Sequence, residues 1–236
     1  MTHNQTNTEF AKLYAALEAP VTALDCGKKC APYNEYGVPF CCDIRHTVPA
    51  LYRQEWEYLR LRTDLWRLWE APPTAEGREL AAGTPPGMVL AACRGHQHCQ
   101  RAYRSLACRA FPFFPYFDSR GEWLGMSYYW DYEDRCWVIS HLEAVTPQFA
   151  EQFFAAFEQL FDAYPQEREI YAYHSQQMRA AFAQRRRAIP LRHRNGQWYK
   201  ISPRNERKRK VAPASLPAHG VYHLAKTLPF PDEITT

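Results

Sequence analysis

Residues 25–43, DCGKKCAPYNEYGVPFCCD, hold four of the eight cysteines of this 236-residue chain and show no regular hydrophobic spacing. A metal ion needs several thiolates that converge on one atom, and tight turns with glycine can deliver them. The turn at 25–30 contains such a glycine, and its two lysines favour the thiolate form of the cysteines beside them. This stretch therefore predicts an irregular segment that binds metal, and we interpret the rest of the chain from it.

The other four cysteines extend the pattern, since three of them lie within residues 93–108 and one lies at position 136. The candidate metal ligands are Cys26, Cys30, Cys41, Cys42, Cys93, Cys99, Cys108 and Cys136. Zinc, iron and iron–sulfur clusters all accept such cysteine-rich sets. A structural zinc ion takes four ligands, so the set could hold two zinc ions or one cluster with spare thiols. We expect Cys26, Cys30, Cys93 and Cys108 to share one coordination sphere or one cluster.

Two other interpretations of the cysteines stay open. Buried cysteines can act simply as small apolar residues, which applies most to Cys136 because it stands alone. Disulfides would suit a secreted protein, but the opening MTHNQTNTEF has no apolar signal segment. No run approaches the roughly 18 apolar residues of a membrane-spanning helix. We therefore expect a cytoplasmic protein without membrane contact. His96 and His98, which lie between Cys93 and Cys99, are further candidate metal ligands.

The order of the cysteines resembles that of the YkgJ-type cysteine-cluster family over about residues 22–117. The segment CRAFPF at 108–113 is the most specific part of this resemblance. One departure is that ten residues separate Cys30 from the Cys41-Cys42 pair, which lies closer in the family. The resemblance implies a zinc- or iron-chelating domain whose cluster falls on the first seven cysteines, with Cys136 outside it.

Hydrophobic patterning predicts an α+β fold in which a cysteine-rich core is followed by helices. Helices are expected at 9–17, at about 47–70 with Thr47 as N-cap, from Thr146, and at 165–184. Strands are expected at 88–92, 123–130 and 136–140, and Asn195-Gly196 predicts a hairpin. Residues 71–87 are expected to be loop with at most one helical turn, and the stretch that ends in CRAFPFFPYF is expected to be irregular. We interpret residues 1–236 as one domain, with the cysteine core at about 22–140, a helical pair at 146–184, and a basic hairpin and tail at 185–236.

The basic residues are concentrated late in the chain. Residues 185–210 carry eleven Lys and Arg against the single acid Glu206, a local charge of +10, whereas the whole chain has +4. The remainder is therefore mildly acidic. Basic runs are commonly solvated faces, so we do not expect nucleic-acid binding, but a protein partner could contact this segment.

Three functions fit these observations. The first is a protein in which zinc or iron holds together loops that cannot pack by themselves. The second is an iron–sulfur or mononuclear iron enzyme; flagellin lysine N-methylases, a related cysteine-cluster type, imply protein lysine methyltransferase activity. The third is a metal chaperone or sensor with a spare accessible thiol. A closed four-thiolate site would favour a structural role, and an open coordination position beside a pocket would favour catalysis.

Overall fold

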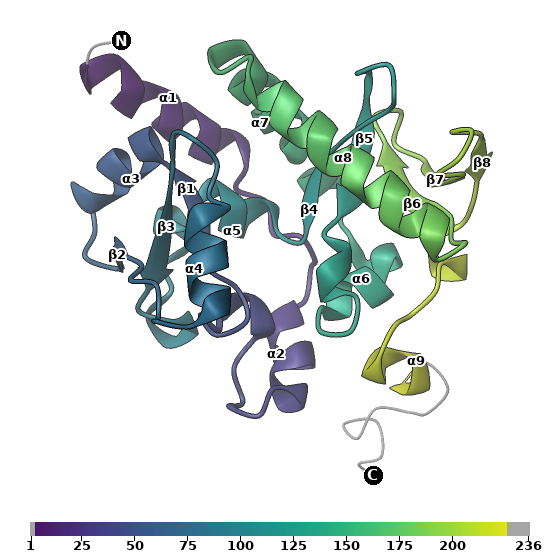
Figure 1. The fold of residues 1–236 in the computed structure, drawn as a ribbon, viewed down its shortest axis with the longest axis horizontal. Helices are drawn as coiled ribbons and strands as arrows, with labels where there is room; N and C mark the ends of the chain where they lie inside the picture. The colour runs from purple at the N-terminus through teal and green to yellow at the C-terminus, as the bar shows by residue number, and fades with distance from the viewer. Residues whose placement is uncertain (1–2, 226–236) are drawn as a thin grey trace.

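The computed structural model describes residues 3–225, which form two antiparallel sheets with helices around them (Figure 1). This arrangement confirms the predicted α+β class. The larger sheet has the strand order β4-β5-β6-β7-β8 and comprises β4 (Phe113–Phe117), β5 (Trp123–Tyr128), β6 (Ile189–His193), β7 (Trp198–Ile201) and β8 (Lys208–Lys210). The smaller sheet has the order β1-β3-β2 and comprises β1 (Ala50–Tyr52), β2 (Trp66–Leu68) and β3 (Met88–Cys93).

The helices differ greatly in length. The longer ones are α1 (His3–Ala16), α3 (Arg53–Arg60), α4 (Ala75–Ala82), α7 (Pro147–Ala163) and α8 (Glu167–Gln184). The short ones are α2 (Cys26–Cys30), α5 (Leu106–Ala110), α6 (Trp137–Ser140) and α9 (Val221–Ala225). None of the helices in residues 3–225 is long and apolar enough to cross a bilayer.

Strand β4 lies between the two long helices α7 and α8. Successive side chains of a strand point to opposite faces, so each helix receives alternate residues of β4. Phe113 contacts Phe149 of α7 with ring centroids 5.9 Å apart, and Phe114 contacts His174 of α8 at 4.5 Å. The apolar stripe predicted after Thr146 therefore forms one side of the core, and both predicted helices are confirmed.

The predicted hairpin at Asn195-Gly196 is also confirmed, since it joins β6 to β7 with Gly196 at φ +81°. The positive φ suits glycine because it has no Cβ to clash with the backbone. Strand β8 pairs with β7 and is fully exposed at the edge of the sheet. Its sequence, Lys-Arg-Lys, suits an edge, because charged side chains discourage pairing with another chain.

The smaller sheet is covered by the N-terminal part of the chain. Helix α1 packs against α3 and α7, and it buries Phe10, Leu13, Tyr14 and Leu17, as its helical spacing predicted. The predicted strand at 88–92 is β3, the centre of this sheet. One continuous cluster of buried apolar residues extends from α1 to α9.

The single long helix expected at about 47–70 is wrong. The segment forms β1, then α3, then β2, and both strands pair with β3. Thr63 helps to end the helical part, because its Oγ1 accepts a hydrogen bond from the backbone N–H of Leu65 at 3.2 Å. Thr47 is not the N-cap; its hydroxyl donates to the carbonyl of Phe40, and Tyr52 precedes α3 instead.

Three further expectations are corrected. Residues 136–140 form no strand, because Cys136 precedes the short helix α6, whose four residues are all buried and therefore show no amphipathic pattern. Residues 71–87 contain the eight-residue helix α4, capped by the Thr74 hydroxyl, rather than at most one turn. The stretch expected to be irregular contains α5 and β4, and β4 tolerates Pro115 because it is an edge strand.

Candidate metal centre

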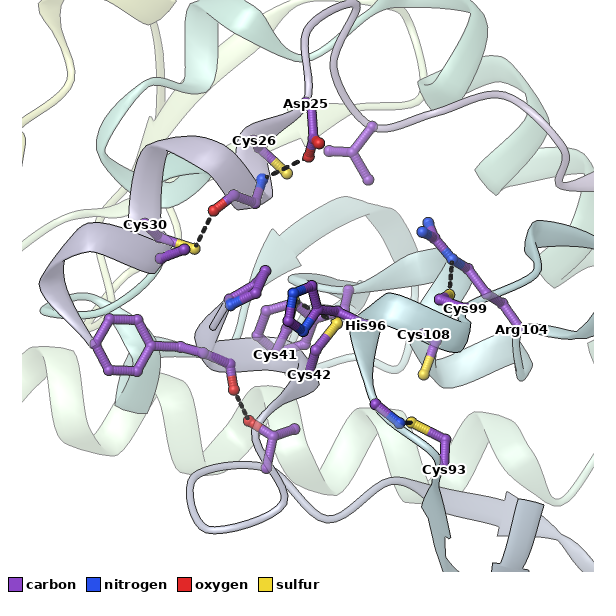
Figure 2. Close-up of a pocket in the computed structure, with 18 of the residues that line it drawn as sticks. Asp25, Cys26, Cys30, Cys41, Cys42, Cys93, His96, Cys99, Arg104 and Cys108 are labelled. Atoms are coloured by element: carbon purple, nitrogen blue, oxygen red, sulfur yellow. Dashed lines mark hydrogen bonds between the residues drawn. The ribbon is translucent and has the colours of Figure 1, made fainter. Parts of the chain in front are cut away.

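All eight cysteines line one cavity of about 580 Å³. Figure 2 labels all of them except Cys136. They come from segments that lie far apart in the sequence, between residues 26 and 136. The side chains are Cys26, Cys30, Cys41, Cys42, Cys93, Cys99, Cys108 and Cys136, and each is a free thiol. The fold therefore brings the whole predicted ligand set to a common place.

Helix α2 positions the first two cysteines. Asp25 caps this helix through Oδ1, which accepts a hydrogen bond from the N–H of Gly27 at 3.0 Å. Cys26 and Cys30 are four residues apart, so they lie on the same face of the helix. Cys30 is 6% exposed, and its thiol donates to the carbonyl of Gly27 at 3.5 Å.

The adjacent Cys41 and Cys42 belong to the short 3₁₀ turn η2 (Phe40–Cys42). Their sulfur atoms lie 4.0 Å apart and share a weak hydrogen bond. When Cys42 ionises, its thiolate accepts this bond from the Cys41 thiol, so the interaction raises the pKa of Cys41 and lowers that of Cys42. Asp43 fixes the end of this turn through bonds to Arg45 and Asn34.

A second part of the wall carries the next three cysteines. Cys93 ends β3, and its sulfur accepts a hydrogen bond from the N–H of Gly95 at 3.4 Å. The sulfur of Cys99 accepts from Nε of Arg104 at 3.1 Å. Cys108 lies in α5, where the hydroxyl of Ser105 accepts from its backbone N–H at 3.2 Å. Both Cys93 and Cys99 are exposed residues.

Helix α5 is held in place from behind the cavity. Glu55 of α3 accepts hydrogen bonds from the hydroxyl of Tyr14 and the N–H of Leu106, both at 2.6 Å. Arg109 is buried and donates to five backbone carbonyls, those of Tyr14, Leu17, Arg101, Ala102 and Arg104. These bonds fix Cys108 relative to α1 and α3.

Burial dominates the acidity of Cys30, Cys108 and Cys136. It raises the pKa of Cys30 to about 11 and the pKa values of Cys108 and Cys136 to about 12. Neighbouring thiols contribute further increases, because two thiolates close together repel each other. A positive charge is therefore needed before these groups ionise together, and a bound metal ion is one source of it.

The lining of the cavity is otherwise basic and apolar. Six Lys and Arg residues reach it, whereas Asp25 is the one carboxylate among the described lining residues; the cationic residues are Lys28, Arg94, Arg101, Arg104, Arg109 and Arg135. Such a lining favours an occupant with negative charge, as a metal ion bound by four thiolates has.

In residues 3–225, no three His, Cys, Asp or Glu side chains converge closely enough to hold one metal ion in the present geometry. Cys26, Cys30, Cys93 and Cys108 all line the cavity, but their predicted sharing of one coordination sphere stays a prediction. His96 and His98 line the same cavity. His46 is not part of the cavity lining, and its ring packs on that of Phe40 at a centroid distance of 5.1 Å.

Sequence reasoning missed the arginines that support the cysteines. Arg104 interacts electrostatically with Cys42, Cys99 and Cys108, and Arg109 orders the chain around α5. The signal was present, because Arg94, Arg101, Arg104 and Arg109 are interspersed among the three cysteines of residues 93–108. Glu55 gave no signal, since a glutamate in an amphipathic helix usually faces solvent.

Comparisons with protein-family models, with curated proteins and with solved structures find no match for this chain.

Proposed function

We propose that this chain is a metal-binding protein whose cysteines hold zinc or iron, the latter as an ion or an iron–sulfur cluster. The observation that carries the proposal is that all eight cysteines line one cavity. Independently buried cysteines have no reason to gather in this way. The resemblance to the YkgJ-type family supports the same function.

The donor set fits such a metal. Thiolates are the preferred ligands of zinc and of iron–sulfur clusters, and the basic lining offsets their charge. Neutral thiols gain nothing by converging on an empty point, so the side chains are expected to turn inward when the metal binds. The bound metal would supply positive charge and, as iron, redox chemistry, while the chain supplies the ligands and their hydrogen bonds.

An iron–sulfur enzyme is a second candidate, with protein lysine methyltransferase as the activity that the resemblance implies. The size of the cavity favours it, because about 580 Å³ falls within the range of small-molecule pockets and exceeds what a closed structural zinc site needs. The exposure of Cys93 and Cys99 favours a third candidate, a metal chaperone or sensor that exchanges its metal.

The test is to purify the protein anaerobically and to measure zinc, iron, acid-labile sulfide and visible absorption together. Iron with sulfide and a broad visible band would identify an iron–sulfur centre and favour the enzyme. A colourless protein with bound zinc would favour the structural or metal-handling role. A protein that binds neither metal, as purified or after reconstitution, would refute the proposal.

A further inference from the structure

Eight thiols exceed what one centre uses, because both a tetrahedral zinc ion and a [4Fe–4S] cluster take four thiolates. Four cysteines would then remain as spare lining, unless the cavity holds a second centre. The neighbours of each thiol separate these two arrangements.

One group of four lies around α2 and α6. These two helices pack against each other, which brings Cys136 close to the face of α2 that carries Cys26 and Cys30. Cys136 interacts electrostatically with both of these thiols. Cys41 also interacts electrostatically with Cys30 and Cys136. We call these four cysteines the α2 set.

The other group lies around α5. In Figure 2, Cys93, Cys99 and Cys108 lie together on one side of the cavity, across from Cys26 and Cys30. Cys42 interacts electrostatically with Cys93 and Cys108, and Cys93 interacts with Cys99. We call Cys42, Cys93, Cys99 and Cys108 the α5 set.

The two sets meet at the adjacent residues Cys41 and Cys42. Their sulfur separation of 4.0 Å also fits two ligands of one zinc ion, whose sulfur atoms would lie about 3.8 Å apart. The distance alone therefore does not separate the arrangements. The electrostatic interactions of the two thiols do, because Cys41 interacts with Cys30 and Cys136, whereas Cys42 interacts with Cys93 and Cys108. Besides the Cys41–Cys42 pair, an electrostatic interaction of Cys30 with Cys42 crosses between the sets.

Resting on the proposed function, we propose that the cavity holds two neighbouring metal centres: the α2 set, Cys26, Cys30, Cys41 and Cys136, binds one, and the α5 set, Cys42, Cys93, Cys99 and Cys108, binds the other. This assignment uses every cysteine once. It places Cys26 and Cys30 on a different centre from Cys93 and Cys108, and it makes Cys136 a ligand.

The first test uses Zn²⁺ alone as the probe, titrated into the reduced full chain against a chromogenic chelator. The wild-type protein should bind two zinc ions per chain. The variant Cys30→Ser/Cys136→Ser should lose the ion of the α2 set, and Cys93→Ser/Cys99→Ser should lose the ion of the α5 set, each retaining one. Loss of all binding in both variants, or one ion in the wild type, would overturn the two-centre proposal while leaving metal binding intact.

The second test needs no variant and so remains decisive if the buried substitutions at Cys30 and Cys136 prevent folding. The wild-type protein receives one equivalent of zinc, and its free thiols are then alkylated and identified by mass spectrometry. In each protein molecule that holds zinc, all four thiols of one set should be protected and all four thiols of the other set should be alkylated. Protection that mixes the sets, such as Cys30 with Cys108, would refute the assignment. Absence of any zinc-dependent protection would refute this inference, whereas the proposed function fails only if the protein also binds no iron.

Discussion

Glu55 lies behind the cysteine cavity, where it is 1% exposed and burial raises its pKa to about 7. A carboxyl whose pKa is raised by folding binds its proton more tightly in the folded state than in the unfolded state. Its contribution to stability is therefore fully present below the unfolded pKa of about 4.5 and is lost as the pH rises through about 7. Glu55 is therefore expected to lower the free energy of unfolding as the pH rises from weakly acidic to neutral.

Glu55→Gln should remove this dependence, because glutamine does not ionise and its amide oxygen can still accept from Tyr14 and Leu106. Between about pH 5 and about pH 8, the wild-type free energy of unfolding should lose roughly 2–3 kcal/mol that the variant retains. Urea unfolding of the reduced, metal-free proteins at both pH values measures this. Glu57→Gln on the same helix, where the carboxylate pairs with Arg60 at the surface, is the control and should keep the wild-type slope. An unchanged slope in the Glu55 variant would contradict the argument.

Arg109→Lys should destabilise the protein although the charge is kept. The planar guanidinium donates to five carbonyls at once, and an ammonium group cannot reach all of them. Leaving buried carbonyls without donors should cost roughly 2–4 kcal/mol, measured as the free energy of unfolding in urea. Arg94→Lys changes a cation that pairs with Asp64 on the exposed rim, and should cost less than about 1 kcal/mol. Equal effects of the two substitutions would show that Arg109 does not organise the chain around α5.

At the scale of the elements, strands β5 and β6 approach each other closely at Gly125. A Cβ added at Gly125 would collide with the carbonyl of Arg192 and would lie 2.9 Å from Cα of His193. Gly125→Ala should therefore force the two strands apart and cost roughly 2–4 kcal/mol. Gly196→Ala is the control at the hairpin turn, where a Cβ meets no neighbour and only the positive φ should cost about 1 kcal/mol. Thermal unfolding of both variants tests this prediction. A smaller decrease of the unfolding midpoint for Gly125→Ala than for Gly196→Ala would contradict it.

The same scale shows which elements could be predicted from the sequence. Helices α7 and α8 and the β6–β7 hairpin were predictable, because an apolar stripe, a Thr-Pro start and Asn-Gly are local signals. The segment at 47–70 was not, since Leu51, Leu59 and Trp66 keep a spacing that suits one helix while they belong to β1, α3 and β2. Pairing with β3, which is remote in sequence, decides that segment. Residues 137–140 are buried on every side, so periodicity could not separate a helix from a strand.

For the candidate site, the sequence allowed the residues to be predicted but not their grouping. Dense cysteines at short spacings mark the ligand candidates in the sequence itself. Which thiols lie together depends on the packing of α2 against α6 and on the hydrogen bond that ties α5 to Glu55 of α3, and these contacts cannot be read from the cysteine spacing. The support from Glu55 was equally hidden, because it lies 51 residues from its partner Leu106.

At the scale of the whole molecule, metal binding should stabilise the walls of the cavity. A ligand that binds the folded state alone raises its stability by mass action, so zinc or iron loading should raise the midpoint of thermal unfolding, and a chelator should reverse the rise. Hydrogen exchange should slow most around residues 26–42 and 93–108, while β4–β7 change little. The Cys93→Ser/Cys99→Ser variant is the control and should show a smaller rise. Uniform slowing across the chain would contradict this localisation.

We also expect one cooperative unfolding transition, because the interpretation of residues 1–236 as one domain requires it. The continuous apolar cluster from α1 to α9 supplies the physical reason. Tryptophan fluorescence and far-ultraviolet circular dichroism, recorded in the same urea titration, should give coincident midpoints. Two separated transitions would indicate that the cysteine core and the helical part unfold independently.

The larger sheet and the helices α7 and α8 contain no cysteine at all. Their packed aromatic rings belong to the continuous cluster of buried apolar residues from α1 to α9, which is held together by apolar burial rather than by a metal. The chain can therefore fold as one unit during biosynthesis without waiting for a cofactor, in contrast to small zinc domains that collapse only around their ion. Under the proposed function, newly made chains would therefore fold in the metal-free state. The cellular supply of metal would determine when each chain is loaded, not whether it folds.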